Sequence, residues 1–494
     1  MSITTEIALK NPSLLRNQSY INGEWTDAAN GATFEVVNPF DFSIVGSVPD
    51  MGAEETRQAI DAAHKAFEGW RSKTATKRAR ILKKWFELQL AHRNDLALLL
   101  TTEQGKPLAE AKGEIAYGAS FVEWFAEEAR RVYGDVIPGH MADKRVMAIK
   151  QPIGVVGAIT PWNFPSAMIT RKVAPALAAG CTVVIKPSDE TPLSALALVA
   201  LAEEAGFPPG VLNVVTAKDP APVGDELTSN PLVRKLSFTG STRVGKILLE
   251  KCAPSVKKVS LELGGNAPFI VFEDADLDEA VKGAMTSKYR NSGQTCICAN
   301  RFFVHASIYD AFTEKFQEAV RRQKVGSGLE SSSQVGPLIN GAALSKVDRL
   351  VKEATSQGAL ALTGGKVIDT EVGHFYEPTV LSKVTDRMQI FREEIFGPVA
   401  PVFSFETEEE VIRLANDTEY GLAAYFYGRD YARIWRVAEA LEYGMVGINT
   451  GAISTVAAPF GGVKHSGMGR EGSKYGIEEY LEIKYLCWGG VTAR

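Results

Sequence analysis

The 494-residue sequence has little of several features that define whole classes of protein. Its five cysteines are an odd, sparse set, typical of reduced thiols rather than of a disulfide framework. No run reaches about 18 apolar residues, and residues 1–25 are polar and of mixed charge, which predicts neither export nor a membrane span. Lysines and arginines form no block, and the net charge is −5, so no nucleic-acid partner is expected. These absences predict a soluble, cytoplasmic protein.

What the sequence has is a regular alternation of strand-like and helix-like segments. Helical periodicity covers residues 54–134, and from residue 152 short β-branched runs alternate with helices that end at glycine. This alternation predicts an α/β fold with a doubly wound parallel sheet, which binds nucleotides at the carboxyl ends of its strands. A second strand–helix series after Gly265 predicts a second α/β domain. Residues 144–150 and 479–488 are strand-like but lie outside both series, and an apolar strand at 479–488 predicts pairing with another subunit.

The chemistry is concentrated in Arg290-Asn-Ser-Gly-Gln-Thr-Cys296-Ile-Cys298. Glu262 stands at the end of an earlier strand-like run. A thiol nucleophile and a carboxylate base are the two groups needed to form and then hydrolyse a thioester. The alternative for a lone cysteine in a loop is a buried thiol that only packs.

Glycine-rich turns supply candidate nucleotide sites. Gly240-Ser-Thr-Arg-Val-Gly245-Lys246 follows a strand and opens a helix, which suits a dinucleotide pyrophosphate, with a plain strand–helix turn as the alternative. It lacks the hydroxyl of a Walker A loop, because Ile247 follows the lysine. Lys186-Pro-Ser188-Asp189 directly follows another candidate strand, earlier in the chain, at a position where an adenosine ribose would lie. Asp189 favours NAD, whereas Ser188 would suit the 2′-phosphate of NADP. The pattern from Gly467 to Gly472 is rejected, because too few residues follow it to complete a strand–helix–strand unit.

These motifs occur in one order with Pro161-Trp162-Asn163-Phe-Pro, Glu262-Leu-Gly-Gly, Glu393-Glu394-Ile-Phe396-Gly-Pro and Pro459-Phe-Gly-Gly. Together they resemble the NAD(P)-dependent aldehyde dehydrogenase superfamily over essentially the whole chain. The resemblance implies a Rossmann-type dinucleotide-binding domain, a second α/β catalytic domain and a small β oligomerisation flap. The corresponding segments are residues 1–135 and 152–264, residues 265–465, and residues 136–151 and 466–494.

The resemblance also implies a role for each motif residue. Cys296 is the expected nucleophile, Glu262 the general base, and Asn163 the side-chain half of an oxyanion hole whose other half is the Cys296 N–H. The expected NAD(P) contacts are Trp162, Lys186, Ser188, Asp189, Gly240, Ser241, Leu263, Glu394 and Phe396. No metal is expected, since the Cys296–Cys298 pair and distant His305 lack a second ligand pair.

Two arginines narrow the expected substrate. Arg171 follows the Asn163 turn and Arg290 precedes Cys296, so both suit an aldehyde that carries a carboxylate. With Ser454 they are similar to the succinate-semialdehyde dehydrogenase branch, where the equivalent residues hold that carboxylate. Glutarate semialdehyde remains an alternative, since one methylene is worth only about 1–3 kcal/mol. The alternative for each arginine is an ion pair at the surface or between domains.

Three further hypotheses stay open. Cys298 is a candidate redox partner that would inactivate the enzyme through a Cys296–Cys298 disulfide, or else a neighbour that merely packs. A P-loop nucleotide hydrolase built on residues 240–246 and a non-catalytic scaffold with this fold are the alternatives from other functional classes. The protein is expected to be a homodimer or a homotetramer.

Overall fold

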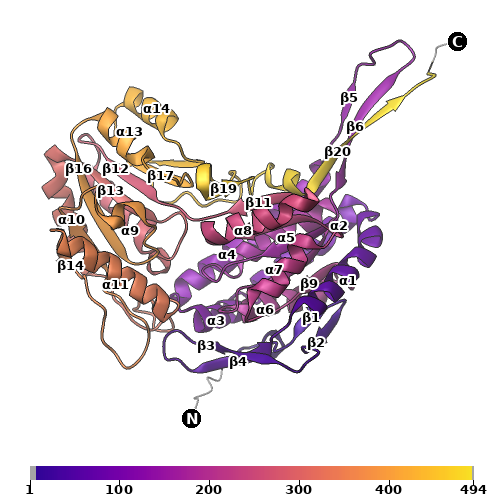
Figure 1. Ribbon diagram of the computed structural model, residues 1–494, viewed down its shortest axis with the longest axis horizontal. Helices are drawn as coiled ribbons and strands as arrows, with labels where there is room; N and C mark the ends of the chain where they lie inside the picture. Colours follow the sequence, from indigo (N-terminus) through magenta and orange to yellow (C-terminus); the bar gives the residue numbers. More distant parts are fainter. Residues whose placement is uncertain (1–6, 492–494) are drawn as a thin grey trace.

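Two large β-sheets and two small ones organise the computed structural model, which describes residues 7–491 (Figure 1). The first large sheet is parallel across its five central strands and antiparallel at both edges. Its strands, in spatial order, are Gly467–Met468 (β19), Lys258–Glu262 (β11), Val233–Thr239 (β10), Val155–Ile159 (β7), Thr182–Lys186 (β8), Leu212–Val214 (β9), Ser19–Ile21 (β1) and Glu24–Thr26 (β2). This order confirms the predicted doubly wound parallel sheet.

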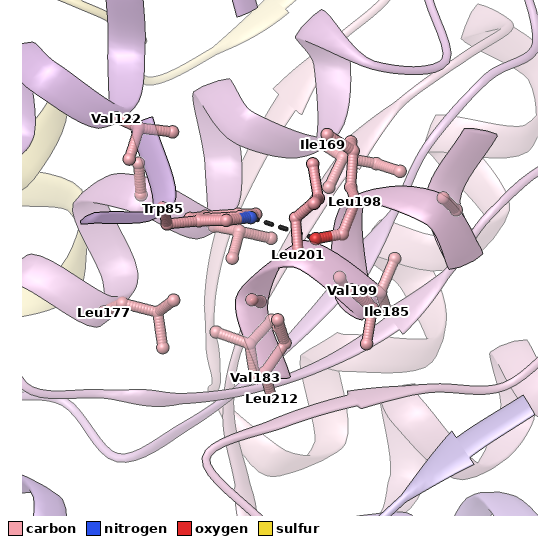
Figure 2. Close-up of a cluster of buried hydrophobic side chains, with 14 of the residues drawn as sticks. Trp85, Val122, Ile169, Leu177, Val183, Ile185, Leu198, Val199, Leu201 and Leu212 are labelled. Atoms are coloured by element: carbon pink, nitrogen blue, oxygen red, sulfur yellow. Dashed lines mark hydrogen bonds between the residues drawn. The ribbon is translucent and has the colours of Figure 1, made fainter. Parts of the chain in front are cut away.

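Helices cover both faces of this sheet because its central strands are apolar on both sides. Val183 and Ile185 of β8 pack in one hydrophobic cluster, and Val184 between them packs in another. The first cluster takes in Ala75–Ala91 (α2), Arg93–Gln104 (α3), Leu108–Glu128 (α4), Ala167–Ala179 (α5) and Pro192–Ala205 (α6). The second takes in Ala53–Arg71 (α1), Pro220–Ser229 (α7) and Thr242–Cys252 (α8). In the first cluster the buried Trp85 ring also donates its N–H to the Leu198 carbonyl at 2.9 Å (Figure 2).

The second large sheet is parallel except for one edge strand, β14. Its strands, in spatial order, are Leu360–Thr363 (β14), Thr379–Ser382 (β15), Val399–Phe405 (β16), Ala299–His305 (β13), Ala267–Val271 (β12), Ala423–Tyr427 (β17) and Met445–Ile448 (β18). The helices of this region are Leu277–Tyr289 (α9), Tyr309–Arg321 (α10), Gly341–Ser356 (α11), Gln389–Arg392 (α12), Glu408–Asn416 (α13) and Tyr431–Ala440 (α14). It is the expected second α/β unit.

A three-stranded antiparallel sheet extends away from the rest of the molecule (Figure 1). It consists of Asp135–Ile137 (β5), Arg145–Pro152 (β6) and Leu481–Trp488 (β20). The two strand-like segments at 144–150 and 479–488 therefore pair with each other, as β6 and β20. Within the segment predicted as the flap, β19 instead pairs with β11 in the first large sheet.

Several elements are absent from the sequence-based prediction. The three-residue strands β1 and β2 offer too few positions to show an alternating pattern. The hairpin of Thr33–Val37 (β3) and Ile44–Pro49 (β4), β17 and α14 are also additional. In the described residues, no helix combines the length and apolar character needed to span a bilayer.

Candidate active site

The segment that carries Cys296 is a turn between α9 and β13 with an unusual backbone. Asn291 and Ser292 both have positive φ, at 50° and 57°, although neither is glycine. Such conformations cost about 1–3 kcal/mol each and persist only where the surroundings fix them. Here Asn291 N–H donates to Glu110 at 2.8 Å, and Ser292 Oγ donates to the Gly336 carbonyl at 2.8 Å. The turn that presents Cys296 is therefore held by distant parts of the chain.

Cys296 lines a cavity of about 290 Å³. The cavity lies where strands of the two large sheets end and loops follow them. Most of the predicted site residues share this cavity. The lining includes Trp162, Asn163, Arg171, Gly240, Ser241, Leu263, Arg290, Glu394, Phe396 and Ser454. The structure thus brings catalytic, cofactor and substrate candidates from separate motifs to one place.

Five predicted residues, Cys298 among them, do not line the cavity. Glu262 is adjacent to it in the chain, before the lining residue Leu263, and is 2% exposed. Lys186, Ser188 and Asp189 lie at and after the end of β8. Asp189 forms an ion pair with Lys218, 3.0 Å between Oδ2 and Nζ.

The two catalytic candidates have strongly perturbed acidity. Burial raises the pKa of the Cys296 thiol to about 12, and the Arg171 charge opposes this rise. Burial also raises the pKa of Glu262 well above its usual range, and the Glu471 carboxylate raises it further. A buried carboxyl with a raised pKa is a stronger base than an exposed one, which suits Glu262 to accept a proton.

Asn163 follows β7 in the turn that leads into α5. Its side-chain amide Nδ2 donates to the Gln294 carbonyl at 3.0 Å and is bound in this way to the Cys296 turn. One Nδ2 hydrogen remains for another acceptor. Asn163 is 6% exposed and lines the cavity with Cys296.

Glu471 and Lys172 are parts of the site that the sequence analysis missed. Glu471 Oε1 accepts from Lys172 Nζ at 2.5 Å, and Glu471 Oε2 lies 2.5 Å from Arg171 Nε. All three side chains are buried. Glu471 belongs to the rejected glycine pattern, whose first two residues, Gly467–Met468, form the edge strand β19 of the first sheet. No sequence signal joins it to Arg171.

The two arginines of the substrate prediction differ in their surroundings. Arg171 is 1% exposed, pairs with Glu471 and lies 4.0 Å from the Phe460 ring. Arg290 is partly exposed, lies 4.9 Å from the Phe164 ring, and makes no ion pair within residues 7–491. Ser454 lines the same cavity as both.

Cys298 lies at the end of the turn with its thiol directed to helix α9. It is 6% exposed, and Sγ donates to the Ser287 and Lys288 carbonyls, at 3.0 and 2.9 Å. All five cysteines are free.

The cofactor candidates fit a dinucleotide. Gly240 precedes α8, whose capping residue Ser241 accepts from the Val244 N–H at 3.4 Å. Gly240 and Ser241 line the cavity, so the amino end of α8 lies at the cavity. A Cβ on Gly245 would come 2.5 Å from Leu263, which requires glycine for this close packing. Glu394 accepts from the Gly265 N–H at 3.0 Å, and burial raises its pKa to about 7. The rings of Trp162 and Phe396 meet edge to face, with centroids 5.7 Å apart.

A doubly wound sheet with a phosphate-type glycine turn and a thiol in the adjoining cavity is typical of a nucleotide-dependent oxidoreductase with a cysteine nucleophile. Comparison with known proteins gives the family. The sequence pattern of the aldehyde dehydrogenase family matches residues 25–486, and the chain belongs to this family. Membership confirms the predicted fold, enzyme class and NAD(P) cofactor, and it excludes the P-loop hydrolase alternative.

The relatives include enzymes named for both candidate substrates. The chain is 64% identical to glutarate-semialdehyde dehydrogenase of Pseudomonas putida, over 97% of this chain and 99% of the relative. It is 62% identical to succinate-semialdehyde dehydrogenase (NADP+) of Escherichia coli, over 97% and 99%. The crystal structure of succinate-semialdehyde dehydrogenase from Burkholderia pseudomallei matches with a TM-score of 0.96 and 62% identity, over 98% of this chain and 100% of that one.

Proposed function

We propose that this protein oxidises succinate semialdehyde to succinate with NAD(P)+, with glutarate semialdehyde as the alternative substrate. The observation that carries the proposal is the position of the Arg290 side chain. Arg290 lines the cavity of Cys296 and makes no ion pair within the described residues, although Glu110 interacts with its charge, so its guanidinium has hydrogen-bond donors for a substrate carboxylate. Ser454 adds a hydroxyl donor in the same cavity. The relatives named for succinate and glutarate semialdehydes support this substrate class.

The reaction begins at Cys296. Because its thiol pKa is about 12, the thiol is protonated near neutral pH and must lose its proton to a base, for which we assign Glu262. Sγ then attacks the aldehyde carbon, and the aldehyde oxygen becomes an oxyanion. The free Nδ2 hydrogen of Asn163 and the Cys296 N–H stabilise it, and loss of one such donor typically costs about 100- to 1000-fold in rate.

When bound, NAD(P)+ supplies the hydride acceptor that turns the thiohemiacetal on Cys296 into a thioester. Gly240, Ser241 and the start of α8 would hold its pyrophosphate, and Lys186, Ser188 and Asp189 its adenosine ribose. Trp162, Leu263, Glu394 and Phe396 would hold its nicotinamide side. Glu262 releases the thiol proton to solvent and then deprotonates a water molecule that attacks the thioester carbon. The C–S bond breaks, the acid leaves, and Glu262 returns the water proton to the Cys296 thiolate.

The test measures NAD(P)H absorbance with succinate semialdehyde, glutarate semialdehyde and butanal, which has the length of the first substrate but no carboxylate. We expect a higher kcat/KM for a carboxyl-bearing aldehyde than for butanal. Equal or better turnover of butanal would contradict the proposed substrate class. Unchanged turnover in Cys296→Ser would contradict the mechanism, and no turnover in the wild type would favour a non-catalytic scaffold.

We also infer a homo-oligomer, a dimer or tetramer, in a reducing compartment such as the cytoplasm. Support for the oligomer comes from apolar side chains on the extended sheet: Val136 is 84% exposed, Ile483 70% and Trp488 63%. Such a strand pairs with another chain or aggregates. The free cysteines favour the reducing compartment.

A further inference from the structure

Lys106 is a buried cation that contacts the backbone carbonyl of Asn163, the proposed oxyanion-hole residue, and does not line the cavity. It lies in the short connection between α3 and α4, and its side chain is fully buried. Its Nζ donates to the Asn163 carbonyl at 2.6 Å and to Glu114 Oε2 at 2.6 Å. The same ammonium lies 3.9 Å from the centre of the Phe164 ring. Lys106 therefore contacts two consecutive residues of the turn that presents the Asn163 amide.

Glu114 ties this cation to the helix that follows the turn. Its Oε1 accepts from the Ser166 N–H at 2.9 Å and the Ala167 N–H at 3.2 Å, at the start of α5. These amides have no partner within the helix, and a carboxylate is favoured at this end of a helix dipole. The Lys106–Glu114 pair thus fixes the turn at Asn163–Phe164 and the helix start after it.

The Asn163 carbonyl also joins the two halves of the oxyanion hole. It accepts a second hydrogen bond from Asn291 Nδ2 at 3.0 Å, and Asn291 belongs to the turn that carries Cys296. Asn291 Oδ1 in turn accepts from Gln104 Nε2 at 3.1 Å, two residues before Lys106. With both lone pairs of its carbonyl occupied, the Asn163 peptide has one orientation, which sets the direction of its side chain.

Stability alone does not explain a charge pair in this place. A buried ion pair is on average no more stabilising than an apolar pair of the same volume, because both charges lose their hydration. Positioning does explain it, since displacement of a catalytic group by about 1 Å costs about 100-fold in rate. We propose that Lys106, held by Glu114, is a positioning residue that aligns the Asn163 amide with the Cys296 N–H, a proposal that rests on the oxyanion-hole role proposed above.

The test separates reactions that form an oxyanion from one that does not, and it needs no cofactor. With p-nitrophenyl acetate, Cys296 Sγ bonds to the acetyl carbon, p-nitrophenolate leaves, and the thiol proton goes to the base. Alkylation of Cys296 by iodoacetamide is a displacement at a saturated carbon and forms no oxyanion. Both rates are compared in wild type, Lys106→Met and Lys106→Met/Glu114→Gln, with the melting temperature of each.

We expect acylation to fall about 10- to 100-fold in both variants, while alkylation changes less than about twofold. The double variant should melt above Lys106→Met, because it leaves no unpaired buried carboxylate. Asn163→Ala should make the Lys106 effect on acylation disappear, since residues that act as one unit are not additive. Lys235→Met is the matched control: Lys235 is also fully buried, pairs with a glutamate and lies outside the cavity lining, but it contacts Glu479 and not Asn163.

The proposal is overturned by several results. Acylation within about twofold of wild type in the folded double variant would show that Lys106 is dispensable. An equal fall in alkylation would show displacement of the whole cysteine turn, and an equal fall in Lys235→Met a general effect of a lost buried cation. If neither Lys106 variant folds, the pair is a stability element. A wild type that acylates but oxidises no carboxyl-bearing aldehyde would refute the proposed substrate class and leave this test intact.

Discussion

Arg171 and Glu471 form a buried ion pair beside the candidate active site, with 2.5 Å between Nε and Oε2. Although burial lowers the pKa of Arg171, Glu471 and Tyr117 hold it above its ordinary value, so the guanidinium stays charged. Arg171 therefore forms an ion pair with a carboxylate inside the protein, whereas Arg290 forms none among residues 7–491 and only interacts electrostatically with Glu110. The two arginines predicted to hold the substrate carboxylate are unequal, and Arg290 should contribute more to binding.

Substitution of Arg290 tests this inequality. A hydrogen bond to a charged group contributes about 1.5–3 kcal/mol, so Arg290→Met should lower kcat/KM for succinate semialdehyde about 10- to 150-fold. Turnover of butanal should change by less than about twofold, since it has no carboxylate to lose. Arg290→Lys keeps the positive charge but not the planar guanidinium. Its kcat/KM for succinate semialdehyde should lie between those of the wild type and Arg290→Met. Equal losses with both aldehydes would assign Arg290 to the turn rather than to the substrate.

Glu471 should set the pH at which Glu262 works. Burial and the Glu471 carboxylate both raise the pKa of Glu262, so Glu471→Gln removes one of the two causes and frees the charges of Arg171 and Lys172. A general base acts deprotonated, and the rising limb of the deacylation rate should move to lower pH. Single-turnover hydrolysis of the acetyl enzyme across pH measures it. A limb that stays or moves upward would refute the coupling, and melting curves control for the broken ion pairs.

Cys298 should decide the response to peroxide. Cys298 lies two positions after Cys296 and forms no disulfide. Its thiol donates hydrogen bonds to two carbonyls of α9. If the two cysteines form a disulfide on oxidation, Cys298→Ala should abolish inactivation that a reductant can reverse, while activity under reducing conditions stays within about twofold. Peroxide titration followed by dithiothreitol measures both. Unchanged, reversible sensitivity in Cys298→Ala would exclude the switch.

Asp189 should influence the choice of cofactor. Its carboxylate lies 3.0 Å from Lys218 Nζ. Lys218 is therefore a second cation, in addition to Lys186, beside the expected ribose site. Asp189→Ser removes the charge that repels a 2′-phosphate and frees Lys218 for it, and the ratio of kcat/KM for NADP to that for NAD should rise. Lys218→Met is the paired variant and should lower the same ratio. A fall of the ratio in Asp189→Ser would place the discrimination elsewhere.

Glu103 predicts a pH dependence of stability. It is fully buried, and its carboxyl accepts from the Leu193 and Ser194 N–H groups at the start of α6, at 2.9 and 2.8 Å. Burial raises its pKa to about 8. Between the ordinary glutamate pKa of about 4.3 and that value, the folded state holds the extra proton, so the free energy of unfolding should fall as pH rises.

Glu103→Gln should flatten this fall, and denaturant titrations from pH 5 to about 8 measure it. The glutamine carbonyl can keep one of the two hydrogen bonds, so a loss of about 1–3 kcal/mol is expected from the amide left without a partner. An unchanged slope would mean that other groups carry the pH dependence.

How much the sequence could predict depended on whether the signal was local. Strand–helix alternation and the glycine turn before α8 are local, and they predicted the parallel sheet and a turn that lines the cavity. The residues around Cys296 predicted the nucleophile, whereas Asn163 became a candidate only through the resemblance to a family. Glu471, in contrast, is 299 positions from Lys172, and only packing of the chain beside β11 brings them together. Lys106 was missed for the same reason, since its importance comes from the tertiary contact with the Asn163 carbonyl.

The left-handed backbone at Asn291 and Ser292 has a consequence for the selection of variants. The folded state carries about 1–3 kcal/mol of strain at each residue, and the free energy of unfolding of a whole domain is only about 5–15 kcal/mol. Glycine adopts this backbone without strain, but it would also remove the Asn291 amide that bonds Asn163 and Gln104 and the Ser292 hydroxyl that bonds Gly336. Each buried partner left without a hydrogen bond costs about 1–3 kcal/mol, as much as the strain relieved, so random screening for heat resistance should leave both residues in place.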